Sequence, residues 1–191
     1  MKPILFNTEM VRAIIRGKKT QTRRIIKPQY AERNGEKIPL DIFAKEFDLS
    51  PFAPHRIGSI LYVRETWRYL NYRLPQLSGF EYAADWAPEY FENSRNPNCC
   101  DNGKWRPSIH MPKKAARIFL RITGVRAERL QNIDVVSCVK EGVDTGVAWT
   151  VDARPNFIKL WDSTIKKADF DEYGWNANPW VFVYEFEQIR E

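Results

Sequence analysis

The chain has 191 residues, a formal net charge of +6 at pH 7 and 43% hydrophobic residues. This apolar fraction is enough to form a core, so the composition excludes a disordered chain. No stretch approaches the roughly 20 apolar residues that a membrane-spanning helix needs, and the first residues lack a signal-peptide core. Together with three cysteines, of which Cys99 and Cys100 are adjacent, these features predict a single cytoplasmic domain without disulfide bonds.

Positive charge is concentrated in two segments of the sequence. Residues 1–30 contain eight lysines and arginines against one acidic residue, Glu9, and residues 104–129 contain eight against Glu128 alone. The remainder of the chain is acidic overall. Clustered cations are typical of proteins that contact nucleic-acid phosphates. A solvated surface is the structural alternative.

The first third of the chain contains signals for a helix, a strand and a long loop. Residues 8–17 are predicted to form a short helix, capped by Thr8 and ended by a left-handed Gly17. Residues 20–26 are rich in β-branched side chains and predict a strand that Pro28 ends. Residues 29–56 are turn-rich, which predicts an irregular insertion or long loop.

The rest of the chain contains signals for further strands and two short helices. Residues 60–69 predict a strand, residues 70–103 a second irregular insertion, and residues 116–130 a strand pair. Two helices are predicted at residues 134–141, between a capping Asp134 and a terminating Gly142, and at residues 155–165. Residues 180–187 predict a closing strand. Short strands with a few helices and no βαβ rhythm indicate an α+β fold built on a small, mostly antiparallel β-barrel.

Residues 17–24 read Gly-Lys-Lys-Thr-Gln-Thr-Arg-Arg and form the most distinctive segment. Guanidinium groups bind phosphates and base edges in a bidentate manner, and hydroxyls and ammonium groups contact the sugar-phosphate backbone. The segment lacks the second glycine of a P-loop. It therefore predicts a binding site for a phosphate or a nucleobase without the P-loop geometry.

Four separated motifs carry a resemblance to a known family. After a short helix come Gly-x-Lys-Thr-x-Thr-x-Arg at 17–24, Gly-Ser-Ile-Leu-Tyr-Val-Arg-Glu-Thr-Trp at 58–67, Trp-Arg-Pro-Ser-Ile-His-Met-Pro at 105–112 and Asn-Pro-Trp-Val at 178–181. In this order they resemble the ASCH family of the PUA-like superfamily, and more narrowly its larger phage and prophage members. The resemblance covers about residues 4–186, and the two predicted insertions match poorly.

The resemblance implies a β-barrel with a cleft beside the first helix that binds RNA or modified nucleosides. Some small bacterial members resemble amidohydrolases that remove the acetyl group from N4-acetylcytidine, using a lysine, a threonine and a glutamate. By position, these roles fall on Lys19, Thr22 and Glu141. No cofactor is implied.

The residue chemistry of this segment is consistent with that assignment. The like charges of Lys18, Arg23 and Arg24 are expected to lower the pKa of Lys19, which would make it a better proton acceptor for the Thr22 hydroxyl. Alternate residues of a strand point to opposite faces. Lys19 must therefore lie in the turn before the strand if it is to act with Thr22.

Further candidate ligand contacts lie at the other motifs, and each has a structural alternative. The predicted nucleic-acid or substrate contacts are Lys18, Arg23, Arg24, Arg64, Glu65, Trp67, Trp105, Arg106 and His110. Arg64 and Glu65 could instead form a neighbouring charge pair, the tryptophans could be core residues and His110 could have a structural hydrogen bond. Three aromatic residues are assigned to the core: Trp161, Trp180 and Phe182.

A metal site is not expected, because the adjacent cysteines and the two isolated histidines match no zinc-binding spacing. Three functions remain as alternatives to an N4-acylcytidine amidohydrolase. They are a non-catalytic RNA reader, a metal-independent ribonuclease and an interaction protein of phage assembly.

Overall fold

The computed structural model describes residues 1–70, 79–86, 104–143 and 152–189. Two compact units make up the chain. The first comprises Met1–Gly17, Ile60–Leu120 and Gln188–Glu191, and the second comprises Lys18–Ser59 and Arg121–Glu187. Most of the predicted insertion at 70–103 lies outside the described residues. The expectation of a single domain with two insertions stays a prediction.

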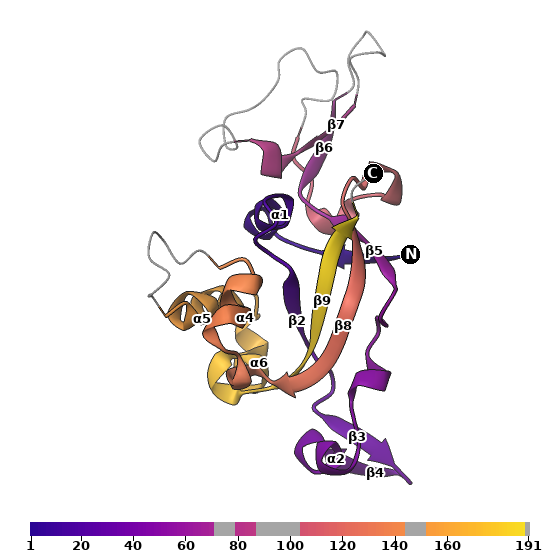
Figure 1. Cartoon of the computed structure of the whole chain (residues 1–191), viewed down its shortest axis with the longest axis vertical. Coiled ribbons are helices and arrows are strands. Elements are labelled where there is room, and N and C mark those ends of the chain that lie inside the picture. Colours follow the sequence, from indigo (N-terminus) through magenta and orange to yellow (C-terminus); the bar gives the residue numbers. More distant parts are fainter. Residues whose placement is uncertain (71–78, 87–103, 144–151, 190–191) are drawn as a thin grey trace. The chain divides into compact units, whose positions relative to one another are not determined.

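The main sheet has five strands in the order β1-β5-β8-β9-β2 (Figure 1). These strands are β1 (Lys2–Leu5), β2 (Gln21–Ile25), β5 (Ile60–Arg64), β8 (Phe119–Arg129) and β9 (Trp180–Ile189). β1 pairs with β5 in parallel, and β2 pairs with β9 antiparallel. The mixed α+β class is confirmed. The order of the described strands ends at β1 and β2, so the expected closed barrel stays a prediction.

Strand β8 is one continuous strand, so the strand pair predicted within residues 116–130 is wrong. The physical reason lies at Gly124, in the middle of the strand. A Cβ atom there would lie 2.9 Å from the Glu185 carboxylate oxygen Oε2. Glycine inside a strand often marks such a close approach instead of a turn.

Helix α1 (Thr8–Ile15) lies where the sequence predicts a helix, but its cap differs. Asn7 is the N-cap, and its side-chain oxygen accepts a hydrogen bond of 2.8 Å from the Met10 main-chain N–H. Thr8 is the first helical residue, so its assignment as cap is wrong; asparagine is an equally good capping residue. Gly17 has the predicted left-handed conformation, with φ of 70°.

Residues 30–46 form regular structure, which corrects the prediction of a long loop at 29–56. They fold into β3 (Tyr30–Arg33), β4 (Glu36–Pro39) and α2 (Leu40–Glu46). Arg33 pairs with Glu36, so the hairpin loop consists of Asn34 and Gly35, with φ of 53° and 84°. Asn-Gly is the preferred pair for a two-residue turn that needs positive φ at both positions.

A second hairpin belongs to the first unit. It pairs β6 (Trp67–Leu70) with β7 (Gly79–Tyr82) antiparallel, placing Trp67 opposite Tyr82 and Tyr69 opposite Phe80. The strand predicted at 60–69 is therefore divided between β5 and β6. Trp67 is buried against Met111 and Ala115, which makes it a core residue of this unit.

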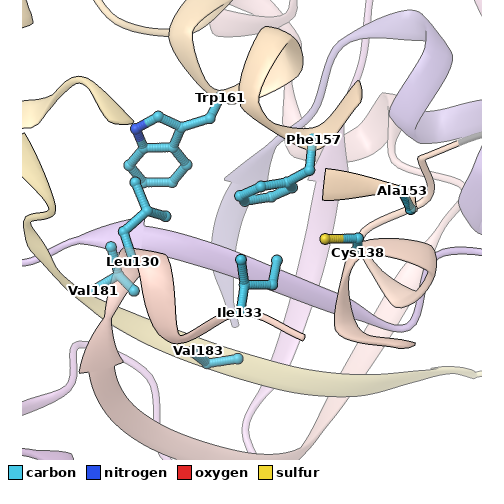
Figure 2. Close-up of a cluster of buried hydrophobic side chains, with 8 residues drawn as sticks. All are labelled: Leu130, Ile133, Cys138, Ala153, Phe157, Trp161, Val181 and Val183. Atoms are coloured by element: carbon cyan, nitrogen blue, oxygen red, sulfur yellow. The ribbon is translucent and has the colours of Figure 1, made fainter. Parts of the chain in front are cut away.

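The core of the second unit lies between its helices and one face of β9. Figure 1 shows α4 (Val135–Lys140), α5 (Arg154–Ser163) and α6 (Phe170–Tyr173) gathered beside β2 and β9. In Figure 2, Phe157 and Trp161 extend from α5 toward the side chains on the sheet. The buried cluster consists of Leu130, Ile133, Cys138, Ala153, Phe157, Trp161, Val181 and Val183.

The predicted ends of α4 are confirmed, because the Asp134 side chain caps its first turn and Gly142 follows it with φ of 85°. The helix predicted at 155–165 is confirmed as α5. Trp161 and Phe182 are buried as predicted, whereas Trp180 is partly exposed. The described 3₁₀ helices are η1 (Ser50–Phe52), η3 (Ala83–Asp85), η4 (Ser108–His110), η5 (Lys113–Ala115), η6 (Leu130–Asn132), η7 (Lys167–Asp169) and η8 (Trp175–Ala177).

None of the helices in the described part of the chain combines the length and the apolar composition that crossing a bilayer requires.

Candidate functional site

The segment before β2 is fixed against the C-terminal end of α4. The Thr20 main-chain N–H donates to the carbonyl of Lys140 at 2.9 Å, and the Thr20 carbonyl accepts from the N–H of Phe186 at 2.9 Å. Lys19 precedes Gln21, the first residue of β2. It therefore lies in the turn before the strand, where joint action with Thr22 requires it.

Lys19 and Glu141 form a buried ion pair, although 122 positions separate them in the sequence. The Lys19 Nζ donates to the Glu141 carboxylate oxygen Oε2 at 2.7 Å, and their side chains are 0% and 5% exposed. Nζ also donates to the main-chain carbonyls of Glu141 at 2.7 Å and Gln21 at 2.9 Å. Lys19 therefore satisfies the last turn of α4 and neutralises a carboxylate that the helix dipole would disfavour there.

The pKa of Lys19 is lowered, as the sequence predicts, but mainly for a different reason. Burial is the largest cause, because it disfavours the charged ammonium form. The Glu141 carboxylate opposes this shift, and the positive charges of Arg24 and Arg23 add smaller lowering effects. Lys18 is exposed and is not among these causes.

Arg23 connects the Lys19–Glu141 pair to a closed ring of polar side chains. Its Nη1 donates to the second Glu141 oxygen, Oε1, at 3.0 Å, and its Nη2 donates to Glu128 at 2.7 Å. Arg23 Nη1 also donates to the Gln21 side chain at 3.1 Å. Two further residues close the ring. Arg126 donates to Glu128 at 2.9 Å and to Glu185 at 2.8 Å, and the Gln21 side-chain amide donates to Glu185 at 3.3 Å. This polar ring consists of Gln21, Arg23, Arg126, Glu128 and Glu185.

The polar ring spans three adjacent strands of the sheet, β2, β8 and β9. Arg23 is buried, and its guanidinium lies 5.9 Å from the centre of the Phe157 ring. Charged groups with little solvent exposure are held firmly when each has a partner. Arg23, the buried member of the ring, therefore holds the Glu141 carboxylate in its orientation, whereas the Arg126 and Glu185 side chains are 40% and 43% exposed.

Thr22 and Arg24 lie on the opposite face of β2 from Gln21 and Arg23. Thr22 is buried and pairs across the strands with Tyr184. Burial raises the pKa of the Tyr184 hydroxyl to about 12, although a hydrogen bond from the His55 main chain opposes the shift. Among the described residues, no hydrogen bond joins Thr22 to Lys19 or Glu141.

The remaining predicted contacts lie in the first unit, where Glu65 has an unexpected partner. The Arg117 Nε and Nη2 atoms donate to the two Glu65 carboxylate oxygens at 2.9 and 3.1 Å, and Glu65 is 1% exposed. Arg64 instead donates to the Ile109 carbonyl at 3.2 Å. The alternative of a neighbouring Arg64–Glu65 pair is therefore wrong. The burial of Glu65 raises its pKa, and Arg117 opposes this shift.

Trp105 and Arg106 differ in their surroundings. Trp105 contacts the Arg68 guanidinium, which lies 4.4 Å from the centre of its ring and 5.0 Å from that of Trp86. Arg68 is 1% exposed and also pairs with Glu81 at 2.7 Å. The Arg106 guanidinium is exposed and lies 5.3 Å from the centre of the Trp67 ring.

His110 is exposed, in the short helix η4.

Sequence reasoning missed several charged residues of both networks. These are Arg68, Glu81 and Arg117 in the first unit and Arg126, Glu128 and Glu185 in the second. All of them except Glu81, which lies in the predicted insertion at 70–103, are charged residues within a predicted strand, but that pattern is equally typical of a solvated strand face. Only burial and a partner distinguish the two cases.

Comparison with known proteins gives no relative: no protein-family model matches the chain, and no match was found among curated proteins or solved structures. Membership of the ASCH family therefore stays an expectation from the four sequence motifs.

Much of the second basic segment is neutralised within the structure. Four of its eight cations have carboxylate partners: Arg117, Arg121, Arg126 and Arg129. No ion pair within the described part of the chain includes the other four, Lys104, Arg106, Lys113 and Lys114. The sequence count of charges therefore overstates the cationic surface that this segment offers to a polyanion.

No group of three or more histidine, cysteine or acidic side chains in the described ranges is arranged to hold a metal ion. Cys99 and Cys100 lie outside these ranges. Cys138 is fully buried, and burial raises the pKa of its thiol to about 11.

Proposed function

We propose that the protein is an ASCH-type, PUA-like barrel protein that binds RNA or a modified nucleoside and hydrolyses an N4-acyl group on cytidine. The observation that supports this best is the buried contact of 2.7 Å between Lys19 and Glu141. Both residues occupy positions that the resemblance assigns to catalysis. Burial also lowers the pKa of Lys19, which favours the neutral amine that a general base requires.

In this proposal, Thr22 is the nucleophile and Lys19 is the base. The Thr22 hydroxyl oxygen bonds to the acyl carbonyl carbon, and its proton moves to the Lys19 amine. The amide C–N bond then breaks, its electron pair goes to the exocyclic nitrogen, and Lys19 returns the proton to that nitrogen. Water cleaves the resulting threonine ester through the same proton acceptor, releases the carboxylic acid and restores the hydroxyl.

Glu141 stabilises the ammonium group that forms on Lys19 during each transfer. Its second oxygen accepts from Arg23 at 3.0 Å, so the carboxylate is held from two sides. Arg24, Lys18 and the exposed end of the 17–24 segment are the proposed contacts to the nucleoside. Because this mechanism needs a neutral Lys19, turnover should rise with pH through an apparent pKa below that of an ordinary lysine.

The test is a chromatographic assay of N4-acetylcytidine hydrolysis by the wild-type protein and variants. Thr22→Ala is expected to lower turnover by at least about 100-fold, the usual contribution of a positioned catalytic group. Thr22→Ser retains a hydroxyl and should keep part of the wild-type turnover. Thr20→Ala is the matched control, since the Thr20 side chain is exposed. Equal turnover by the wild type and Thr22→Ala would contradict the proposed mechanism.

A non-catalytic RNA reader is the second candidate, and one observation favours it. Lys19 donates to three acceptors, so its three ammonium hydrogens can all be satisfied without a ligand. A purely structural Lys19 would give binding without turnover. Measuring the affinity for acetylated RNA alongside hydrolysis separates the two functions. The metal-independent ribonuclease is tested by including an unmodified RNA in the same assay.

A further inference from the structure

An exposed basic segment in the first unit is held rigidly to the unit's core. This segment, residues 104–114, is here called the basic strap. The main chains of Arg106 and Trp67 exchange two hydrogen bonds of 2.8 and 3.2 Å, which join the strap to β6. Met111 is fully buried within it, and directly after it Ala115 is 1% exposed and accepts a hydrogen bond of 2.7 Å from the Tyr82 hydroxyl. The strap is therefore a fixed surface.

The exposed side chains of the strap are mostly cationic. They include Lys104, Arg106, Lys113 and Lys114, together with His110. Within the described residues, none of these side chains forms an ion pair. This contrasts with Arg117, three residues beyond the end of the strap, which has two carboxylate partners at 2.9 and 2.7 Å. Four cations without a carboxylate partner among the described residues, on an anchored segment, offer positive charge to an external anion.

Aromatic side chains on the hairpin adjoin the strap. Arg106 lies over the ring of Trp67, and Tyr69 follows two residues later on the same face of β6. Tyr69 is 37% exposed and stacks edge-on with Phe80, with ring centres 5.1 Å apart. A partly exposed tyrosine held in place by a second aromatic ring is a suitable surface for stacking a nucleobase.

From these observations we propose that the basic strap and Tyr69 form a binding surface for single-stranded nucleic acid. The four cations contact successive phosphates, and an unstacked base packs on Tyr69. A duplex is a poorer ligand, because its bases are already stacked on one another and are not free to cover the ring. This surface extends the proposed function, since it favours a polynucleotide over a free nucleoside as the natural ligand.

The experiment measures fluorescence anisotropy of a labelled, unmodified 12-nucleotide RNA at several salt concentrations. The test variant combines Lys104→Gln, Arg106→Gln, Lys113→Gln and Lys114→Gln. The control variant makes the same change of charge at four exposed lysines of the second unit: Lys45, Lys159, Lys166 and Lys167. Glutamine is chosen because it retains much of the side-chain stem, including the part of Arg106 over Trp67.

The expected magnitudes follow from counterion release. Each phosphate contact contributes about 0.7 to the slope of log K against log salt for a single strand. Loss of four contacts should reduce the slope by about 3 and the affinity at 0.15 M salt by about 200-fold. Tyr69→Ala should weaken binding by roughly 5- to 150-fold without changing the slope, because stacking releases no counterions. Phe52→Ala, which removes an exposed ring in the second unit, is its control.

Several outcomes would overturn the proposal. These are wild-type affinity of the strap variant, an equal loss in the control variant, or equally tight strap-dependent binding of a duplex. Strap-dependent binding to phosphatidylserine vesicles without binding to RNA or DNA would identify a membrane surface instead. Parallel RNA and DNA oligonucleotides show which strand is preferred. The ligand contains no acyl group, so failure here leaves the N4-acetylcytidine assay unaffected, and failure of that assay leaves this result standing.

Discussion

Replacement of Glu141 by glutamine tests whether the Lys19–Glu141 pair behaves as a buried ion pair. The substitution keeps the shape of the side chain but removes the negative charge of Glu141, whose two oxygens lie 2.7 Å from Lys19 Nζ and 3.0 Å from Arg23 Nη1. The amide has one acceptor oxygen, so its NH₂ group must face one of the two cations. Breaking a buried pair by removing one partner costs about 3–5 kcal/mol, and we expect the lower end here because one acceptor remains.

The assay is urea unfolding at pH 7 followed by tryptophan fluorescence. A loss of about 3 kcal/mol is a large part of the 5–15 kcal/mol typical of a folded protein, so the midpoint should fall clearly. Lys19→Met combined with Glu141→Gln should cost less than the sum of the two single changes, by about 2 kcal/mol.

A surface ion pair provides the control for this cycle. Arg33 and Glu46 lie 3.8 Å apart with side chains 58% and 63% exposed, and Glu46→Gln should stay within about 0.5 kcal/mol of the wild type. If Glu141→Gln costs no more than Glu46→Gln, or if the Lys19 and Glu141 costs are additive, the buried pair does not have the strength assigned to it.

Three further predictions concern local features of the second unit. Gly124→Ala would place a Cβ 2.9 Å from Glu185 Oε2, so this flexible carboxylate must move away from Arg126. The loss of that partly exposed ion pair should lower the free energy of unfolding by about 0.5–1 kcal/mol relative to Gly79→Ala, whose Cβ meets no atom within 4 Å; equal costs in urea unfolding would refute the clash. Asp134→Ala removes the cap of α4 and should cost about 1 kcal/mol in the same assay, with no change of midpoint arguing against capping. With its pKa raised to about 11 by burial, Cys138 should react with a disulfide reagent at pH 8 only after denaturation. The measurement uses a variant whose other two cysteines are serine, and rapid reaction of the folded protein would contradict it.

Short-range signals predicted much of the secondary structure. The Asp134 cap and the following Gly142 delimit α4 in the sequence and in the structure. The Asn34-Gly35 pair is an equally local signal for a hairpin, but the prediction takes Gly35 and the prolines that follow it as signs of a loop. Its turn depends on two adjacent residues that tolerate positive φ, a local property.

Errors in the strands have a different origin. Gly124 lies within β8, at the point where the Glu185 side chain approaches the backbone. That contact joins residues far apart in the sequence, so no local pattern distinguishes this glycine from one in a turn. The same limit applies to Glu65, whose partner Arg117 comes from a distant segment.

The candidate site was only partly predictable. The resemblance named Lys19, Thr22 and Glu141, and simple alternation required Lys19 to precede the strand, which it does. Nothing in the sequence pointed to the polar ring or to Arg23 as the second partner of Glu141. The sequence also predicts more unpaired positive charge in residues 104–129 than the structure contains. Four arginines of this segment form ion pairs with carboxylates from other elements.

The sequence by itself determined the two ends of α4, the left-handed glycine after α1, the strands β2 and β9 and the two regions where cations are concentrated, since caps, turns and side-chain alternation act over a few residues. The tertiary structure decided which charges are buried and paired and which stay exposed on the basic strap. The energy of a charge depends on its solvent exposure and on partners brought from distant positions, and only the folded chain sets both.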